Sequence, residues 1–85
     1  MTEEHRQQPR RRTLKGGEIV FHEGGSSIDC VIRNDSAEGA MLKVASVVGI
    51  PDRFILTGDG PPRHCVVVWR RADSLGVHFE GEATL

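Results

Sequence analysis

Two short segments of the chain carry residue types suited to holding a ligand. The first runs from Asn34 to Gly39 and reads Asn-Asp-Ser-Ala-Glu-Gly. Asn34 offers amide donors and a carbonyl acceptor, Ser36 offers a hydroxyl, and Gly39 permits a left-handed or closely approached backbone. The same residue types are the usual ones in ordinary turns, so this segment taken alone favours a structural role over ligand binding.

The second segment is a cluster of arginines near the start of the chain: Arg6, Arg10, Arg11 and Arg12. The planar guanidinium group pairs bidentately with phosphate oxygens or with the O6 and N7 edge of guanine, and it stacks on bases. Residues 1–15 hold five basic and two acidic residues, a net +3, whereas residues 16–85 hold six basic and ten acidic residues, a net −4. The basic arm therefore indicates an anionic partner, although a solvated or weakly nucleic-acid-binding tail also fits this charge.

Length and composition indicate one small folded domain. The chain has 85 residues, of which 38% are hydrophobic and 27% charged, as in soluble globular domains. No apolar run approaches the roughly 20 residues that a membrane helix needs, and the polar residues 1–8 do not resemble a signal peptide. We therefore expect a cytoplasmic protein without membrane insertion.

Cys30 and Cys65 each stand among apolar residues, which favours buried, reduced thiols over a disulfide. The four histidines are scattered, and none has a close ligand spacing to another histidine or to a cysteine. We expect no metal site.

From Glu18 onward the apolar residues alternate with period two, which is typical of strands with one buried face. Residues 18–22 fit a first strand, and the second places Ile28, Cys30 and Ile32 on one side, opposite Asp29, Val31 and Arg33. The inward residues expected in the later strands are Ala40, Leu42, Val44, Phe54, Leu56, Cys65, Val67, Trp69, Val77 and Phe79.

Turn-forming residues separate all six segments, and no amphipathic helix is evident. We therefore expect an all-β fold, a small six-stranded antiparallel β-barrel over residues 16–85, with a flexible basic arm over residues 1–15. Closure into a barrel removes the exposed strand edges that favour aggregation. Trp69 and Phe79 are expected to supply much of the core volume.

Taken together, the arginine cluster and the polar turn resemble the PilZ family. The family has an R-x-x-x-R stretch before its first strand and a D/N-x-S-x-x-G turn after its second. Arg6 and Arg10 fit the first element; Asn34, Ser36 and Gly39 fit the second. The stretch from residue 66 to residue 79 also looks like the family's closing hairpin, and the expected barrel agrees with the family's fold.

The resemblance implies a receptor for the bacterial second messenger cyclic di-GMP. Arg6 and Arg10 would then hold phosphates and guanine edges, with Arg11 or Arg12 as alternatives for the second arginine. Asn34 and Ser36 would hydrogen-bond a guanine or a phosphate, and Gly39 would let the backbone pass close to the ligand.

On this interpretation the protein is an adaptor without catalytic activity or cofactor, monomeric or weakly dimeric. Binding would order the arm and present a changed surface to a partner protein. The main alternative is a PilZ-fold interaction module that binds no nucleotide. Nucleic-acid binding is less favoured, because every aromatic residue is assigned to a core position. Enzymatic activity is the weakest alternative, since no nucleophile motif or carboxylate pair is present.

Overall fold

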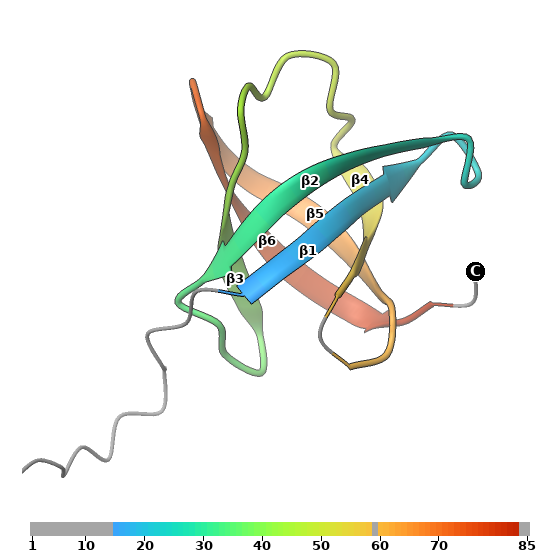
Figure 1. Cartoon of the computed structure of the whole chain (residues 1–85). Coiled ribbons are helices and arrows are strands. Elements are labelled where there is room, and N and C mark those ends of the chain that lie inside the picture. Colours follow the sequence, from blue (N-terminus) through green and yellow to red (C-terminus); the bar gives the residue numbers. More distant parts are fainter. Residues whose placement is uncertain (1–14, 59, 84–85) are drawn as a thin grey trace, which may run out of the picture.

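The computed structural model describes residues 15–58 and 60–83, and these residues form an all-β, closed antiparallel barrel. Its six strands follow one another around the wall in the order β1-β2-β3-β6-β5-β4 (Figure 1). Their bounds are β1 Lys15–Phe21, β2 Ser26–Arg33, β3 Gly39–Lys43, β4 Arg53–Thr57, β5 Arg63–Arg71 and β6 Ser74–Glu82.

The expected fold class, a six-stranded antiparallel β-barrel, is confirmed. β1 begins at Lys15, so the first strand takes in one residue of the expected arm. The rest of the arm, residues 1–14, lies outside the described residues. The described residues contain no helix that is long and apolar enough to cross a membrane.

The barrel interior is filled by the inward residues of the alternating strands. Ile19, Leu42 and Leu75 are fully buried, and Ile32, Phe54, Leu56 and Val77 are buried around them. Phe79 and Val67 pack against this cluster while partly exposed. Ile50, from the loop between β3 and β4, is also buried, although its sequence context predicted only a turn.

The expectation of buried, reduced cysteines is confirmed. Cys30 and Cys65 are both free thiols and both buried in the barrel. Loss of water on burial, reinforced by the charges of Asp29 and Glu18, raises the pKa of Cys30 to about 11. Burial likewise raises the pKa of Cys65 to about 12, against an opposing effect of Arg63. Both groups therefore remain protonated at neutral pH.

The expectation that Trp69 fills the core is wrong. Trp69 is 40% exposed and stands on the outer face of the barrel. The register between β5 and β6 shifts after Val67, because Val67 pairs with Val77 while Trp69 pairs with Gly76. Val68 is the extra residue of this β-bulge, and it reverses the alternation so that Val68 and Trp69 both point outward.

Barrel closure depends on β6, which lies between β3 and β5. Gly39 pairs with His78 and Met41 pairs with Gly76, so the beginning of β3 lies against the middle of β6. The turn between β2 and β3 is thereby brought next to the outer face of the β5–β6 hairpin. This neighbourhood holds the candidate site.

Candidate functional site

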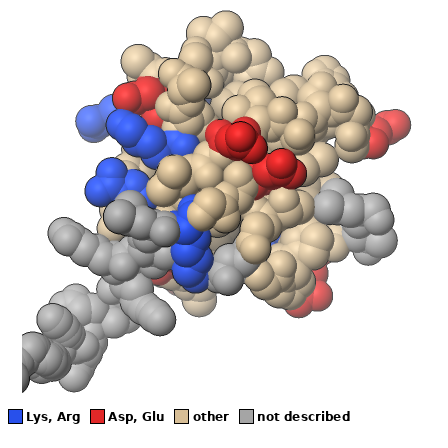
Figure 2. All heavy atoms as spheres, in the orientation of Figure 1, with Lys and Arg blue, Asp and Glu red and all other residues tan. Residues whose placement is uncertain are grey.

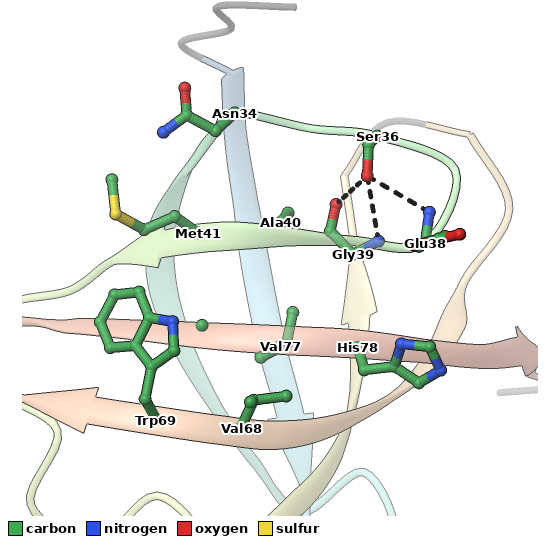
Figure 3. Close-up of a pocket in the computed structure, with 11 residues that line it drawn as sticks. Asn34, Ser36, Glu38, Gly39, Ala40, Met41, Val68, Trp69, Val77 and His78 are labelled. Carbon is green, nitrogen blue, oxygen red and sulfur yellow. Dashed lines mark hydrogen bonds between the residues drawn. The ribbon is translucent and has the colours of Figure 1, made fainter. Parts of the chain in front are cut away.

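A shallow pocket of about 370 Å³ lies on the outer face of the barrel where β3, β6 and β5 run side by side (Figure 3). The turn between β2 and β3 borders the pocket on one side, and the bulge of β5 borders it on the other. Its lining residues are Asn34, Ser36, Glu38, Gly39, Ala40, Met41, Val68, Trp69, Gly76, Val77 and His78. The three residues expected from the polar turn therefore all line one pocket.

Ser36 organises the turn through its hydroxyl. Its Oγ donates to the carbonyl oxygen of Gly39 at 3.2 Å and accepts from the backbone N–H groups of Glu38 and Gly39, each at 3.3 Å. The Ser36 backbone N–H also donates to the Gly39 carbonyl at 2.9 Å. A hydroxyl has one hydrogen to donate and two lone pairs, so this one is fully used within the turn. In this state Ser36 shapes the site and has no free capacity for a ligand.

Asn34 has a positive φ of 50°. Asparagine tolerates this left-handed conformation better than most residues, which explains its place at the end of β2. In Figure 3 its amide stands beside the Met41 side chain, at the edge of the pocket. Among the described residues its amide has no hydrogen-bond partner, so Asn34 is the turn residue best placed to bind a ligand.

Gly39 is required by a close backbone contact. A Cβ at this position would overlap the carbonyl oxygen of Val77 on β6, and its φ is not in the left-handed region. Of the two expected reasons for this glycine, a left-handed turn and close approach of backbone, the second is the one observed. The neighbour it admits is the β6 backbone.

Trp69 forms the wall of the pocket opposite the turn. Its indole lies over Gly76, where a side chain of any size would overlap the ring. The Arg71 guanidinium carbon lies 5.5 Å from the Trp69 ring centroid, within range of a cation–π interaction. The pocket therefore combines an aromatic surface with the amide of Asn34.

The first described residue of β1 lies beside the polar turn. Lys15 pairs with Ile32 on β2, and its Nζ lies 3.9 Å from a carboxylate oxygen of Asp35. The arginines expected to bind ligand, Arg6, Arg10 and Arg11, and their alternative Arg12, lie outside the described residues.

Charge is unevenly distributed over the barrel. In Figure 2 the basic side chains of the viewed face gather on one side, while the acidic side chains are spread more widely. Asp35 and Glu38 bring negative charge to the polar turn, and Lys15 pairs with Asp35. The carboxylate of Glu38 thus remains as an unfavourable neighbour for an anionic ligand.

The pocket residues that lie outside the polar turn were not predicted as site residues from the sequence: Ala40, Met41, Val68, Trp69, Gly76, Val77 and His78. Met41 lies between the expected inward residues Ala40 and Leu42, so the alternation predicts that it points outward, but nothing in its own strand indicates a pocket. His78 pairs with Gly39 across β3 and β6, a juxtaposition of residues far apart in sequence. The pairing of strands around the barrel would have been needed to find them.

A comparison with models of known protein families found no matching family, and a comparison with curated proteins found no matching sequence.

Proposed function

We propose that this protein is a cytoplasmic receptor for cyclic di-GMP that uses the outer-face pocket between the polar turn and Trp69. One observation carries the proposal: Asn34, Ser36 and Gly39 line one pocket, and Lys15, which follows the arginine-rich segment in the sequence, lies beside the same turn. The resemblance to the PilZ family rests on these same two elements. It is supported by the closed barrel, in which Lys15, the first residue of β1, lies beside the polar turn.

The residues divide into two groups on this proposal. Asn34 hydrogen-bonds a guanine edge or a phosphate oxygen, and the arginines before β1 supply the positive charge. Ser36 and Gly39 shape the turn through contacts within the protein. A pocket of about 370 Å³ accepts a nucleobase with part of the phosphodiester ring, and the rest of the ligand lies across the mouth.

Isothermal titration with cyclic di-GMP at low and moderate salt tests the proposal. We expect binding that weakens with salt, because each ligand carries two phosphates. Arg10→Ala is expected to abolish binding. Asn34→Gly is expected to weaken it about tenfold or more, since glycine accepts the positive φ but has no amide.

A matched control is Arg53→Ala, which removes an arginine from β4, outside the pocket. The Arg53→Ala variant should bind cyclic di-GMP with the same affinity as the parent protein. If the Arg10→Ala and Asn34→Gly variants bind cyclic di-GMP as tightly as the parent protein does, the ligand does not bind at this site. GMP and cyclic di-AMP serve as competitors that separate a guanine-specific site from a general anion site.

The second candidate is a PilZ-like interaction module without a nucleotide ligand. The saturated hydroxyl of Ser36 favours it, because the motif then has a complete structural explanation within the turn. Absence of binding at high cyclic di-GMP concentration, with a folded protein, would select this alternative. In both cases the protein acts through a partner and catalyses no reaction.

A further inference from the structure

Two rows of side chains cross the outer face of the barrel beside the pocket. Along the first row Arg33 pairs with Met41, Met41 with Gly76, and Gly76 with Trp69. Along the second row Val31 pairs with Lys43, Lys43 with Ser74, and Ser74 with Arg71. The two rows are two residues apart on each strand, so their side chains share one face of the sheet.

We name the six longer side chains of these rows the basic–apolar strip: Val31, Arg33, Met41, Lys43, Trp69 and Arg71. Four neighbouring strands about 4.8 Å apart make the strip roughly 14 Å wide. Val31 is 39% exposed and Trp69 is 40% exposed, so two large hydrophobic groups face solvent here. Small residues of β6, Ser74 and Gly76, lie between them.

The positive charge of the strip is only partly balanced. Lys43 pairs with Asp73 at 3.0 Å, whereas Arg33 and Arg71 have no ion-pair partner among the described residues. Arg71 instead lies against the Trp69 ring. Residues 16–85 as a whole carry a net −4, so this face opposes the charge of the rest of the barrel. An acidic partner is therefore attracted to this face and repelled elsewhere.

We infer that the basic–apolar strip docks an acidic segment of a partner protein that also carries aliphatic side chains. Trp, Met and Arg are the residue types enriched in protein interfaces, and Trp and Arg dominate their binding energy. Val31 and Met41 are aliphatic neighbours suited to packing leucine or valine. Only one ring is available for stacking, which favours a polypeptide over single-stranded nucleic acid.

The inference rests on the proposed function only for its regulatory consequence. Met41 and Trp69 line the pocket as well as the strip, so a nucleotide in the pocket would lie against the docked segment. Ligand binding would then change the partner's affinity through direct contact. Docking itself does not require nucleotide, and the test is made in its absence.

The probe is a short fluorescein-labelled peptide of glutamates with interspersed leucines, followed by anisotropy and by NMR of the labelled protein. We expect salt-sensitive binding with shifted amides at Val31, Met41 and Lys43. Arg33→Glu should weaken binding about tenfold or more, whereas Arg53→Glu, the same charge change on β4, should not. Val31→Ser should also weaken it without disturbing the core, since Val31 faces outward.

Four outcomes would overturn the inference. These are absence of binding, equal binding of an all-glutamate peptide, tighter binding of a thymidine oligonucleotide, and self-association of the protein through the same residues. Repeating the titration with Arg10→Ala, which removes the proposed nucleotide contact, separates the two proposals. Peptide binding should persist in that variant even where cyclic di-GMP binding is lost.

Discussion

The Trp69 indole covers Gly76 on the neighbouring strand, so an aromatic side chain on the barrel surface takes the space that a side chain of β6 would fill. The two residues are directly paired, and Gly76 is buried although it lies on the outward face. An aromatic ring placed over a glycine in this way compensates for the packing that glycine lacks. The wall of the pocket is therefore fixed by a cross-strand pair.

Replacing Gly76 by alanine should displace the indole. The new methyl group would overlap the ring, and we expect a loss of about 1–3 kcal/mol in unfolding free energy, as in other overpacked sites. Urea denaturation followed by circular dichroism measures this loss, because this signal is also present in variants that lack Trp69, the single tryptophan. In a Trp69→Ala background the same substitution should cost much less, and an undiminished cost would contradict the pairing.

Gly39→Ala should destabilise the barrel for a different reason. Its methyl group would meet the carbonyl oxygen of Val77, a backbone atom that cannot rotate away. We expect a loss of about 2 kcal/mol or more. Gly16→Ala on β1 is the matched control, because a Cβ there has nothing within 4 Å, and its denaturation midpoint should not fall.

Ser36→Ala should loosen the turn. The hydroxyl makes three hydrogen bonds to backbone groups, and their removal should cost about 1–3 kcal/mol in total. Faster hydrogen exchange at the amides of Glu38 and Gly39 would report this directly. Ser36→Thr keeps the hydroxyl and should restore most of the protection, an outcome that a direct ligand contact alone would not produce.

The two cysteines should make the fold sensitive to alkali. Burial raises the pKa of Cys30 to about 11 and that of Cys65 to about 12, from an ordinary value of 9.0. Below pH 9 both thiols are protonated in the native state and in the unfolded chain, so the full stability of the fold is present. Above it the unfolded chain loses protons that the native state retains, so stability falls by up to about 1.4 kcal/mol per pH unit for each thiol until the native pKa is reached.

Denaturation midpoints measured from pH 8 to pH 11 test this pH dependence, with a Cys30→Ala/Cys65→Ala variant as the control. The variant will be less stable at pH 8 but should show a shallower decline. If the parent protein and the variant lose stability equally as the pH rises, ionisable groups other than the two cysteines cause the loss. Thiol reagents should also react slowly with the native protein and quickly after unfolding, because the thiolate is the reactive form.

Trp69 should report occupancy of the proposed site. It is the single tryptophan of the chain, it is partly exposed, and it lines the pocket. Cyclic di-GMP bound there should change its emission and protect it from acrylamide quenching. A ligand that binds by calorimetry without either effect would have to lie elsewhere on the protein.

Period-two alternation predicted the barrel well because most strands expose one face and bury the other. Ile28, Cys30 and Ile32 show this, since the charged residues Asp29 and Arg33 mark the opposite face as outward. In β5 the run from Val66 to Trp69 is apolar throughout, so it carries no information about faces, and the bulge at Val68 could not be seen.

Only the part of the candidate site that is contiguous in sequence, the polar turn, was predictable. The polar turn is contiguous in sequence, and its residues lie together as expected. The opposite wall comes from β5 and β6, and its position depends on pairing between distant strands and on a one-residue insertion in one of them. Neither property is encoded in a short window of residues.

The position of β6 between β3 and β5 has a consequence for biosynthesis. Of the six strands it is the last to be translated, and until it arrives both β3 and β5 present unpaired edges. A nascent chain that lacks β6 has no pocket, and it is open to pairing with other nascent chains. Stalled or truncated products should therefore aggregate, and a ligand could protect the protein only after translation of β6.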